Sequence, residues 1–367
     1  MPVIHNVPYS SSISNHNQLP AFHASIFQNL MIRLTFIRFW LFSITLAVIF
    51  PASAFSSEDW TQFKTTYFDN GRVIDIGQNN ISHSEGQGMA LLLAVQNDDP
   101  ATFAQVWKWT QFHLQVRDDK LFAWSWSPQT GVNDMNNASD GDVLIAWALS
   151  RAYTKWNKPS YLFAAIQVSQ SIRAKLFRKT SKGIVLLPGA ADFEKPEGIK
   201  LNLSYWIFPA ITELSVLDPA PEWEDLRITG LKLIQEARFG KWQLPSDWLN
   251  LQNDVVAPAD NDQFGYDAVR IPLYVIWGRQ ATPDSIKPFQ NFWGSFTGKS
   301  LLPAWVNVNT GEMATYNASI GFQSIAALTL LYPDLDATQL PSFNPSEGYY
   351  SSMLSLFTKM ALEDLKK

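Results

Sequence analysis

The sequence predicts an all-α fold in which helices pair into hairpins. Apolar residues recur at helical spacing in about eleven segments, which come at fairly regular intervals. Few segments alternate with the period of two that a half-buried strand requires. No linker rich in Pro, Ser or Gly divides the chain after residue 54. We therefore expect one large domain, a toroid of helical hairpins whose loops form an open cleft at one end.

Each expected helix has an apolar face, and some also have a recognisable first or last residue. Pro100 suits the first position of its helix, where a missing N–H costs nothing. Gly240 lies just past the end of another helix. A short strand is expected near residues 183–186. The expected helices span residues 60–68, 87–95, 100–114, 140–156, 161–176, 204–217, 222–237, 267–277, 285–296, 318–331 and 350–365.

Composition excludes several classes of function. The 367 residues carry a formal net charge of −5, which argues against nucleic acid as a partner. There is no cysteine, so disulfides and thiol catalysis are excluded. The sequence contains no phosphate loop, dinucleotide fingerprint or zinc-type ligand spacing, and we expect neither a cofactor nor a metal. The 15 tryptophans serve either core packing or stacking on the apolar faces of sugar rings.

The N-terminal region reads as a leader followed by an export signal. Residues 1–30 are polar and without period, which indicates disorder or a start codon placed too early. From Met31 the pattern becomes a positive region, an apolar run over residues 39–50 and a small-residue cleavage site ending at Ala54. The apolar run is shorter than the roughly 20 residues of a membrane span. We expect cleavage after Ala54, an exported protein that is periplasmic or secreted, no lasting membrane anchor, and a catalytic domain over residues 55–367.

Three acidic residues stand at the starts of expected helices. They are Glu85, followed closely by two glycines, Asp140 and Asp267. Alternate helices of hairpins bring their starts to one rim, so the three carboxylates are expected to meet over one cleft. Two carboxyls flanking a glycosidic bond are the usual equipment for glycoside hydrolysis. The alternative for each acid is a capping or helix-dipole role, worth a few tenths to about 1 kcal/mol. Arg270 is either a simple ion-pair partner of Asp267 or the group that orients its carboxylate.

The motifs around these residues resemble one enzyme family when they are taken together and in order. They are Trp60-Thr61-Gln62-Phe63-Lys64, Ser84-Glu85-Gly86-Gln87, Phe122-Ala123-Trp124-Ser125-Trp126, Asn137-Ala138-Ser139-Asp140-Gly141-Asp142, Ser204-Tyr205-Trp206 and Tyr266-Asp267-Ala268-Val269-Arg270. This set resembles glycoside hydrolase family 8, and most closely its periplasmic endoglucanases that accompany bacterial cellulose synthases. The resemblance covers the chain from about residue 58 onward.

The resemblance implies an (α/α)6 toroid that cleaves β-1,4-glucan internally, with inversion at the anomeric carbon. It implies Glu85 as the general acid, Asp267 as the base that activates water, and Asp140 as the group that binds and distorts the sugar. Arg270 would keep Asp267 ionised. Inversion leaves room for a water, so the carboxyls of Glu85 and Asp267 are expected roughly 6.5–9.5 Å apart.

Further residues and partners follow from the same resemblance. The candidates for sugar stacking are Trp124, Trp126, Tyr205 and Trp206. The partners are a β-1,4-glucan polysaccharide and the cellulose synthase machinery. Inversion by two carboxyls requires no metal.

The sequence departs from the family pattern close to the acid. Met89 stands where the family usually has a Tyr, and the two residues after it are also changed. The substitution removes a ring and a hydroxyl near Glu85, which would lower activity if that ring seats the acid or the sugar. Leu203 replaces an expected Pro, a smaller and local change.

Other functions remain open on the same fold. A chitosanase, lichenase or xylanase would keep the acidic motifs and change the substrate, and a chitosanase would need additional acidic residues in the cleft. A catalytically impaired glucan-binding protein is a further alternative, which rests on the changed residues behind Glu85. The joint presence of three acidic motifs argues against a purely structural toroid.

Overall fold

The computed structural model describes residues 56–367, and eleven α-helices make up nearly half of that part. The expected leader, signal and cleavage site lie outside the described residues. The helices are α1 Ser57–Tyr67, α2 Ser84–Gln96, α3 Pro100–His113, α4 Ser139–Trp156, α5 Pro159–Leu176, α6 Phe208–Leu217, α7 Pro221–Glu236, α8 Arg270–Trp277, α9 Pro283–Gly294, α10 Ile320–Leu331 and α11 Tyr349–Leu365. Every expected helix is present, so the all-α prediction is confirmed.

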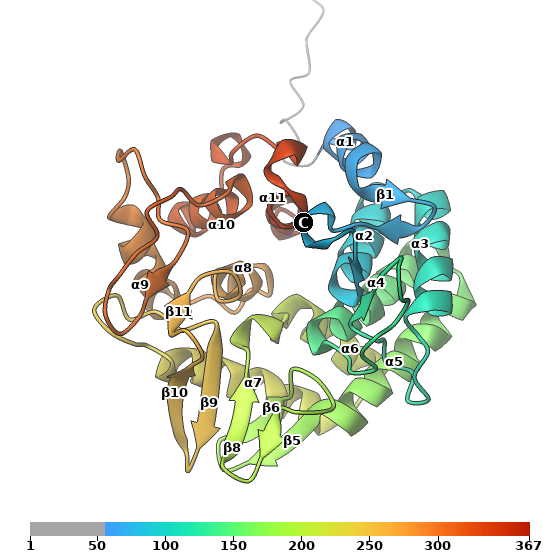
Figure 1. Cartoon of the computed structure of the whole chain (residues 1–367), viewed down its shortest axis with the longest axis horizontal. Helices are drawn as coiled ribbons and strands as arrows, with labels where there is room; N and C mark the ends of the chain where they lie inside the picture. Colours follow the sequence, from blue (N-terminus) through green and yellow to red (C-terminus); the bar gives the residue numbers. More distant parts are fainter. Residues whose placement is uncertain (1–55) are drawn as a thin grey trace, which may run out of the picture. The chain divides into compact units, whose positions relative to one another are not determined.

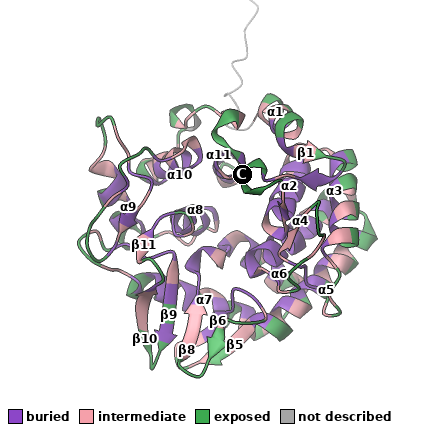
Figure 2. Cartoon of the chain, in the orientation of Figure 1, coloured by how far each residue is buried: buried purple, intermediate pink, exposed green. Residues whose placement is uncertain are grey.

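Six of these helices form a closed inner ring. Going around the ring, α2 contacts α4, then α6, α8, α10 and α11 follow, and α11 contacts α2 again. The helices α1, α3, α5, α7 and α9 lie outside the ring, each against an inner helix (Figure 1). Buried residues concentrate on the inner helices, while the outer ones expose their outward side (Figure 2). The predicted toroid of hairpins is therefore observed.

Local signals explain several helix starts. Asp99 caps α3 by accepting a hydrogen bond from the Thr102 N–H at 3.0 Å, and Pro100 occupies the first position as predicted. Thr282 and Ser285 form a reciprocal capping box at the start of α9. These caps satisfy N–H groups that the first turn of a helix leaves without intrahelical partners.

Two helices begin three or four residues later than predicted, and both of these starts lie at the cavity described below. Leu203–Tyr205 form a short 3₁₀ turn, η2, before α6 begins at Phe208. Asp267 lies in a turn that precedes α8 instead of starting that helix. In both places a side chain accepts hydrogen bonds from turn N–H groups, Asn202 at η2 and Asp247 before α8, and so stabilises a non-helical entry.

Short strands occupy the loops between helices. The expected strand at 183–186 is β6 Gly183–Leu186, which pairs with β5 Phe177–Thr180. The hairpin of β9 (Trp248–Gln252) and β10 (Val255–Ala259) turns at Asn253 and Asp254, which both have positive φ and form a tight two-residue connection. The remaining strands are β1 Phe68–Asp69, β2 Arg72–Val73, β3 Ser82–His83, β4 Ser125–Trp126, β7 Glu194–Lys195, β8 Gly198–Leu201, β9 Trp248–Gln252, β10 Val255–Ala259, β11 Gln263–Phe264 and β12 Val306–Asn307.

The one larger sheet among the described residues, in the order β10-β9-β8-β7, was not predicted. Its signal was present, because β9 alternates buried and exposed residues and the Asn-Asp turn follows it. None of the helices within residues 56–367 is long and apolar enough to span a membrane.

Candidate active site

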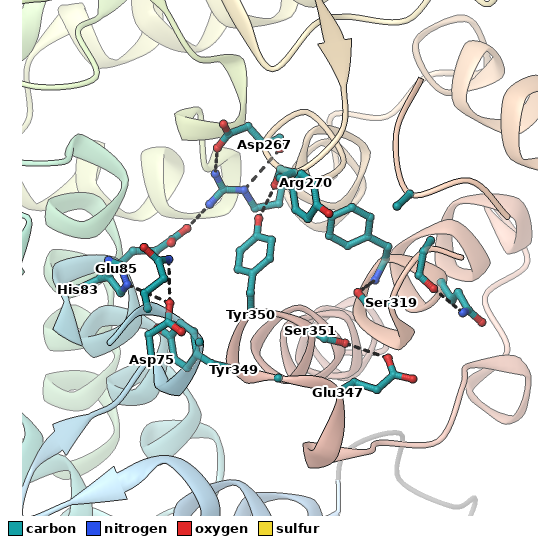
Figure 3. Close-up of a pocket in the computed structure, with 18 of the residues that line it drawn as sticks. Asp75, His83, Glu85, Asp267, Arg270, Ser319, Glu347, Tyr349, Tyr350 and Ser351 are labelled. Atoms are coloured by element: carbon teal, nitrogen blue, oxygen red, sulfur yellow. Dashed lines mark hydrogen bonds and ion pairs between the residues drawn. The ribbon is translucent and has the colours of Figure 1, made fainter. Parts of the chain in front are cut away.

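The three predicted carboxylates meet on a single arginine, and Figure 3 shows two of them, Glu85 and Asp267, beside Arg270. The Arg270 guanidinium donates from Nη1 to the Glu85 carboxylate and from Nη2 to Asp267 Oδ1 at 2.7 Å. Its Nη1 also lies 3.4 Å from Asp140 Oδ2. A guanidinium presents donors in a fixed planar fork, so one residue can hold carboxylates on several sides. The expectation that these residues gather over one cleft is met.

Two of the carboxylates lie on regular helices that pack closely together. Glu85 and Asp140 occupy the first turns of α2 and α4. A Cβ at Gly141 would collide with the Ser84 hydroxyl and approach the Glu85 backbone N to 2.7 Å, so the absence of a side chain there lets the helices meet. The N-cap interpretation of Asp140 is wrong, because Ala138 holds that position without a side-chain bond.

Burial separates the members of this cluster. The side chains of Arg270 and Asp140 are only 3% and 4% exposed, whereas Glu85 and Asp267 are 22% and 25% exposed toward the cavity. Burial raises the pKa of Asp140 well above its usual value, and the charge of Glu85 adds to that rise. Burial also raises the pKa of Asp267, while the Arg270 charge opposes the rise. Asp140, the more deeply buried of these two carboxyls, is thus the more disposed to keep its proton.

The cluster lines an open cavity of about 940 Å³. Residues at or just before the starts of all six inner helices reach it, namely Glu85, Asp140, Tyr205, Arg270, Ser319 and Tyr349. The inner helices therefore all present their N-terminal ends to the cavity. The positive ends of the helix dipoles stabilise negative charge there.

Several residues of this cavity were not found from the sequence. His83 Nε2 lies 3.2 Å from Asp75 Oδ2, and this pair borders Glu85 (Figure 3). Tyr350 donates its hydroxyl to the Tyr266 carbonyl at 2.5 Å. Glu347 accepts a hydrogen bond from the Ile320 N–H at 2.5 Å. A short helix start and a lone acid or histidine give no sequence signal of their own. The ring closure by α11 brings Glu347 and Tyr350 to the cavity.

The four predicted stacking residues have different fates. Tyr205 lines the cavity. Trp206 is fully buried and donates its ring N–H to the Leu226 carbonyl at 3.1 Å, so its prediction as a sugar platform is wrong. The Trp206 ring packs against Gly230 of α7, and a Cβ at position 230 would collide with it. Trp124 and Trp126 are half-buried and lie outside the lining of this cavity, where Trp126 packs on Trp109.

Comparison with known proteins agrees with this geometry. Residues 34–364 match the family described as glycosyl hydrolases family 8. The chain belongs to glycosyl hydrolase family 8. It is therefore a glycoside hydrolase, and both the resemblance drawn from its motifs and the (α/α)6 fold are confirmed.

Individual relatives support the same placement. A probable endoglucanase of Novacetimonas hansenii is 36% identical over 318 residues, which are 85% of this chain and 92% of the relative. The solved structure of an endo-β-1,4-glucanase from Acetobacter xylinum is 36% identical with a TM-score of 0.80, covering 84% of this chain and 98% of that one. The family 8 endoglucanase Cel10 of Klebsiella pneumoniae is 34% identical with a TM-score of 0.79, covering 84% and 99%.

The departures from the family pattern lie in the core. Met89 is 1% exposed and packs inside the apolar cluster, and it does not line the cavity. A ring beside Glu85 comes instead from Tyr349 of α11. Its hydroxyl occupies the space that a Cβ at Gly86 would fill. Leu203 is also buried, in η2. Met89 is therefore not placed to contact a sugar in the cavity.

Proposed function

We propose that this glycoside hydrolase is an endo-β-1,4-glucanase that inverts the anomeric carbon. The relatives named above are called endoglucanases, which supports the substrate class. One observation carries the proposal, namely the contact of Arg270 with carboxylates from three separate parts of the ring. An open cavity, unlike a closed pocket, accepts a polymer along its length.

In the proposed reaction, Glu85 gives its proton to the glycosidic oxygen as the bond from that oxygen to the anomeric carbon breaks. Asp267 takes a proton from a water whose oxygen attacks the same carbon from the opposite face. Both side chains are partly exposed to the cavity, which this role requires. We keep the prediction that their carboxyls stand roughly 6.5–9.5 Å apart, with room for the water.

Asp140 and Arg270 have supporting roles in this proposal. Because burial raises the pKa of Asp140, its protonated carboxyl can donate a hydrogen bond to a sugar hydroxyl and hold the ring in a distorted shape. The charge of Arg270 keeps Asp267 ionised despite its burial. Burial also raises the pKa of Tyr349, so its hydroxyl keeps its proton and can donate a hydrogen bond to a sugar.

The decisive test is release of reducing sugar from carboxymethylcellulose by the protein, by Glu85→Gln and by Asp267→Asn. We expect activity in the first and a loss of at least about 10³-fold in both variants, with the α-anomer as the first product by NMR. Release of the β-anomer would rule out inversion. Binding of cello-oligosaccharides without any release would favour the alternative of an impaired glucan-binding protein.

A second candidate substrate is chitosan, because the cavity holds more acids than the reaction uses. Asp75 and Glu347 add two carboxylates to its lining, as a polymer of cationic amino sugars would favour. Asp75 is engaged by His83, however, and Glu347 by the start of α10, so we place chitosan behind glucan. Parallel assays on chitosan, lichenan and xylan decide the order, and chitosan hydrolysis faster than glucan hydrolysis would reverse it.

Export and a role beside cellulose synthase are also part of the proposal. They rest on the signal-like segment ending at Ala54 and on the resemblance to endoglucanases of cellulose-producing bacteria. Fractionation of expressing cells, with N-terminal sequencing of the product, tests the cleavage. A mature protein that still begins before Ala54 would contradict it.

A further inference from the structure

A buried carboxylate outside the catalytic cluster holds the turn that carries Asp267. Asp247 lies just before β9, and its side chain is buried. Its Oδ1 accepts three backbone hydrogen bonds, from Gly265 at 2.9 Å, Asp267 at 3.1 Å and Ala268 at 2.8 Å. Its own N–H donates to the Gln263 carbonyl at 2.6 Å. Asp247 is thus joined at four points to the six residues from 263 to 268.

These bonds satisfy N–H groups that the local backbone leaves open. The carbonyls of the turn accept backbone bonds from the residues that follow it, from Val269 to Gly265 at 3.2 Å, from Arg270 to Asp267 at 3.1 Å and from Ile271 to Ala268 at 3.0 Å. The N–H groups of residues 265, 267 and 268 precede the helical ladder of α8, so they need an outside acceptor. Asp247 supplies that acceptor from a segment about 20 residues earlier in the chain.

The approach of Asp247 to the turn is tight. A Cβ at Gly265 would lie 3.2 Å from Asp247 Oδ2 and 3.1 Å from the Trp305 Cβ. A glycine at this position is therefore needed for the carboxylate to reach the turn without displacement. Asp247 itself does not line the cavity.

We propose that Asp247 is a positioning residue that fixes the turn 265–268 and thereby holds the Asp267 carboxylate where it can activate water. The proposal rests on the proposed function of Asp267 as base. The two carboxyls also interact electrostatically. Burial raises the pKa of Asp247 to about 7, and the charge of Asp267 adds to this rise. The two carboxylates repel each other, so placing Asp247 beside Asp267 is unfavourable for packing alone and indicates a functional role for Asp247.

The test compares two replacements of Asp247. Asp247→Asn keeps an oxygen that accepts the three N–H groups, and we expect kcat within about tenfold of the wild type. Asp247→Ala removes the acceptor, and we expect kcat to fall about 100-fold with KM for cello-oligosaccharides within about threefold. Asp218→Ala is the matched control, because Asp218 is a buried carboxylate that binds Arg173 and Trp223 away from the cavity. It should lower Tm without lowering kcat of the folded protein.

A double-mutant cycle separates positioning of Asp267 from general damage. If Asp247 acts through Asp267, adding Asp247→Ala to Asp267→Asn should cost little further activity, measured with an activated cello-oligosaccharyl fluoride. Multiplicative losses, or an Asp247→Ala defect confined to KM, would overturn the proposal while leaving the proposed function intact. An Asp267→Asn variant as active as the wild type would instead remove the proposed function.

A second variant covers the case in which Asp247→Ala does not fold. Gly265→Ala keeps the carboxylate but forces the turn away from it by a few tenths of an ångström. We expect the same selective fall of kcat, again silent in the Asp267→Asn background. A Gly265→Ala enzyme with unchanged kcat would contradict the proposal.

Discussion

The two sides of the cavity position their carboxylates by different means. On one side, Glu85 and Asp140 stand on the first turns of α2 and α4, which pack against each other through Gly141. On the other side, Asp267 lies in a turn outside the helical ladder, held by hydrogen bonds that the N–H groups of the turn donate to Asp247. The first arrangement depends on helix packing and the second on a buried polar network. Arg270 joins the two.

The difference teaches where rigidity comes from in this site. A helix start gives a side chain a fixed direction as soon as the helix packs, so its precision follows from the core. A turn has no such support and needs every N–H group satisfied by a partner. Changes on the helix side should therefore reduce stability and activity together, whereas changes on the turn side should reduce activity more than stability.

The largest effect is expected from removing the residue that joins both sides. Arg270→Met leaves Asp140 and two partly exposed carboxylates without their cation, and breaking a buried ion pair in this way costs about 3–5 kcal/mol. We expect kcat to fall by at least about 10³-fold, with a matching drop in the free energy of unfolding measured in urea. Arg270→Lys keeps the charge but not the planar fork of donors, so its kcat and stability should lie between those of the wild type and of Arg270→Met. Wild-type stability in Arg270→Met would show that the cluster does not contribute to folding.

A smaller effect is expected from pushing apart the helices on the first side. Gly141→Ala inserts a methyl group between α4 and the start of α2, an overpacking that costs about 1–3 kcal/mol. Because the displaced residues are next to Glu85, kcat should fall along with Tm. Gly294→Ala in α9 is the control, since its Cβ would meet only Leu330 at an ordinary 3.7 Å. Loss of activity in Gly141→Ala without any loss of Tm would break the proposed contrast.

The smallest effect concerns the pH dependence of stability, and both sides should contribute to it. Burial raises the pKa of Asp142, in the first turn of α4, to about 7, as it does for Asp247. A carboxyl whose pKa is higher in the folded state binds more protons there between about pH 4 and 7, so stability falls as pH rises through that window. The free energy of unfolding should drop from pH 4.5 to 7.5, and Asp247→Asn should lessen the drop. An equal drop in that variant would show that Asp247 does not titrate in this range.

The helix side could be predicted from sequence, because its signals are local. Apolar spacing, Pro100 and an acid at each helix start indicate where α2, α3 and α4 begin, and sequence order then brings Glu85 and Asp140 to one rim. The sequence predicts Met89 as a departure from the family pattern, but its burial could not be read from a helix whose residues are apolar on nearly all sides.

The turn side could not be predicted to the same depth. Asp247 reads as an ordinary polar residue before a short strand, and its three partners lie 18 to 21 residues further on. The helix expected to begin at Asp267 begins instead at Arg270, because the Asp247 carboxylate satisfies the turn's N–H groups in another geometry. Trp206 was taken for a sugar platform because adjacent Tyr205 and Trp206 look alike in sequence, and only tertiary packing turns one to the cavity and the other to the core.

The closure of the ring by α11 has a consequence for how the enzyme is made. Of the six inner helices, α11 comes last in the chain, yet it contacts both α2 and α10. During synthesis, the other five emerge first, with the apolar faces that α11 will cover still open to water. Tyr349 and Tyr350 arrive with the same helix. A nascent chain halted before residue 349 would hold Glu85, Asp140, Asp267 and Arg270 but no closed ring, so assembly of the fold and of the cavity end in one late step.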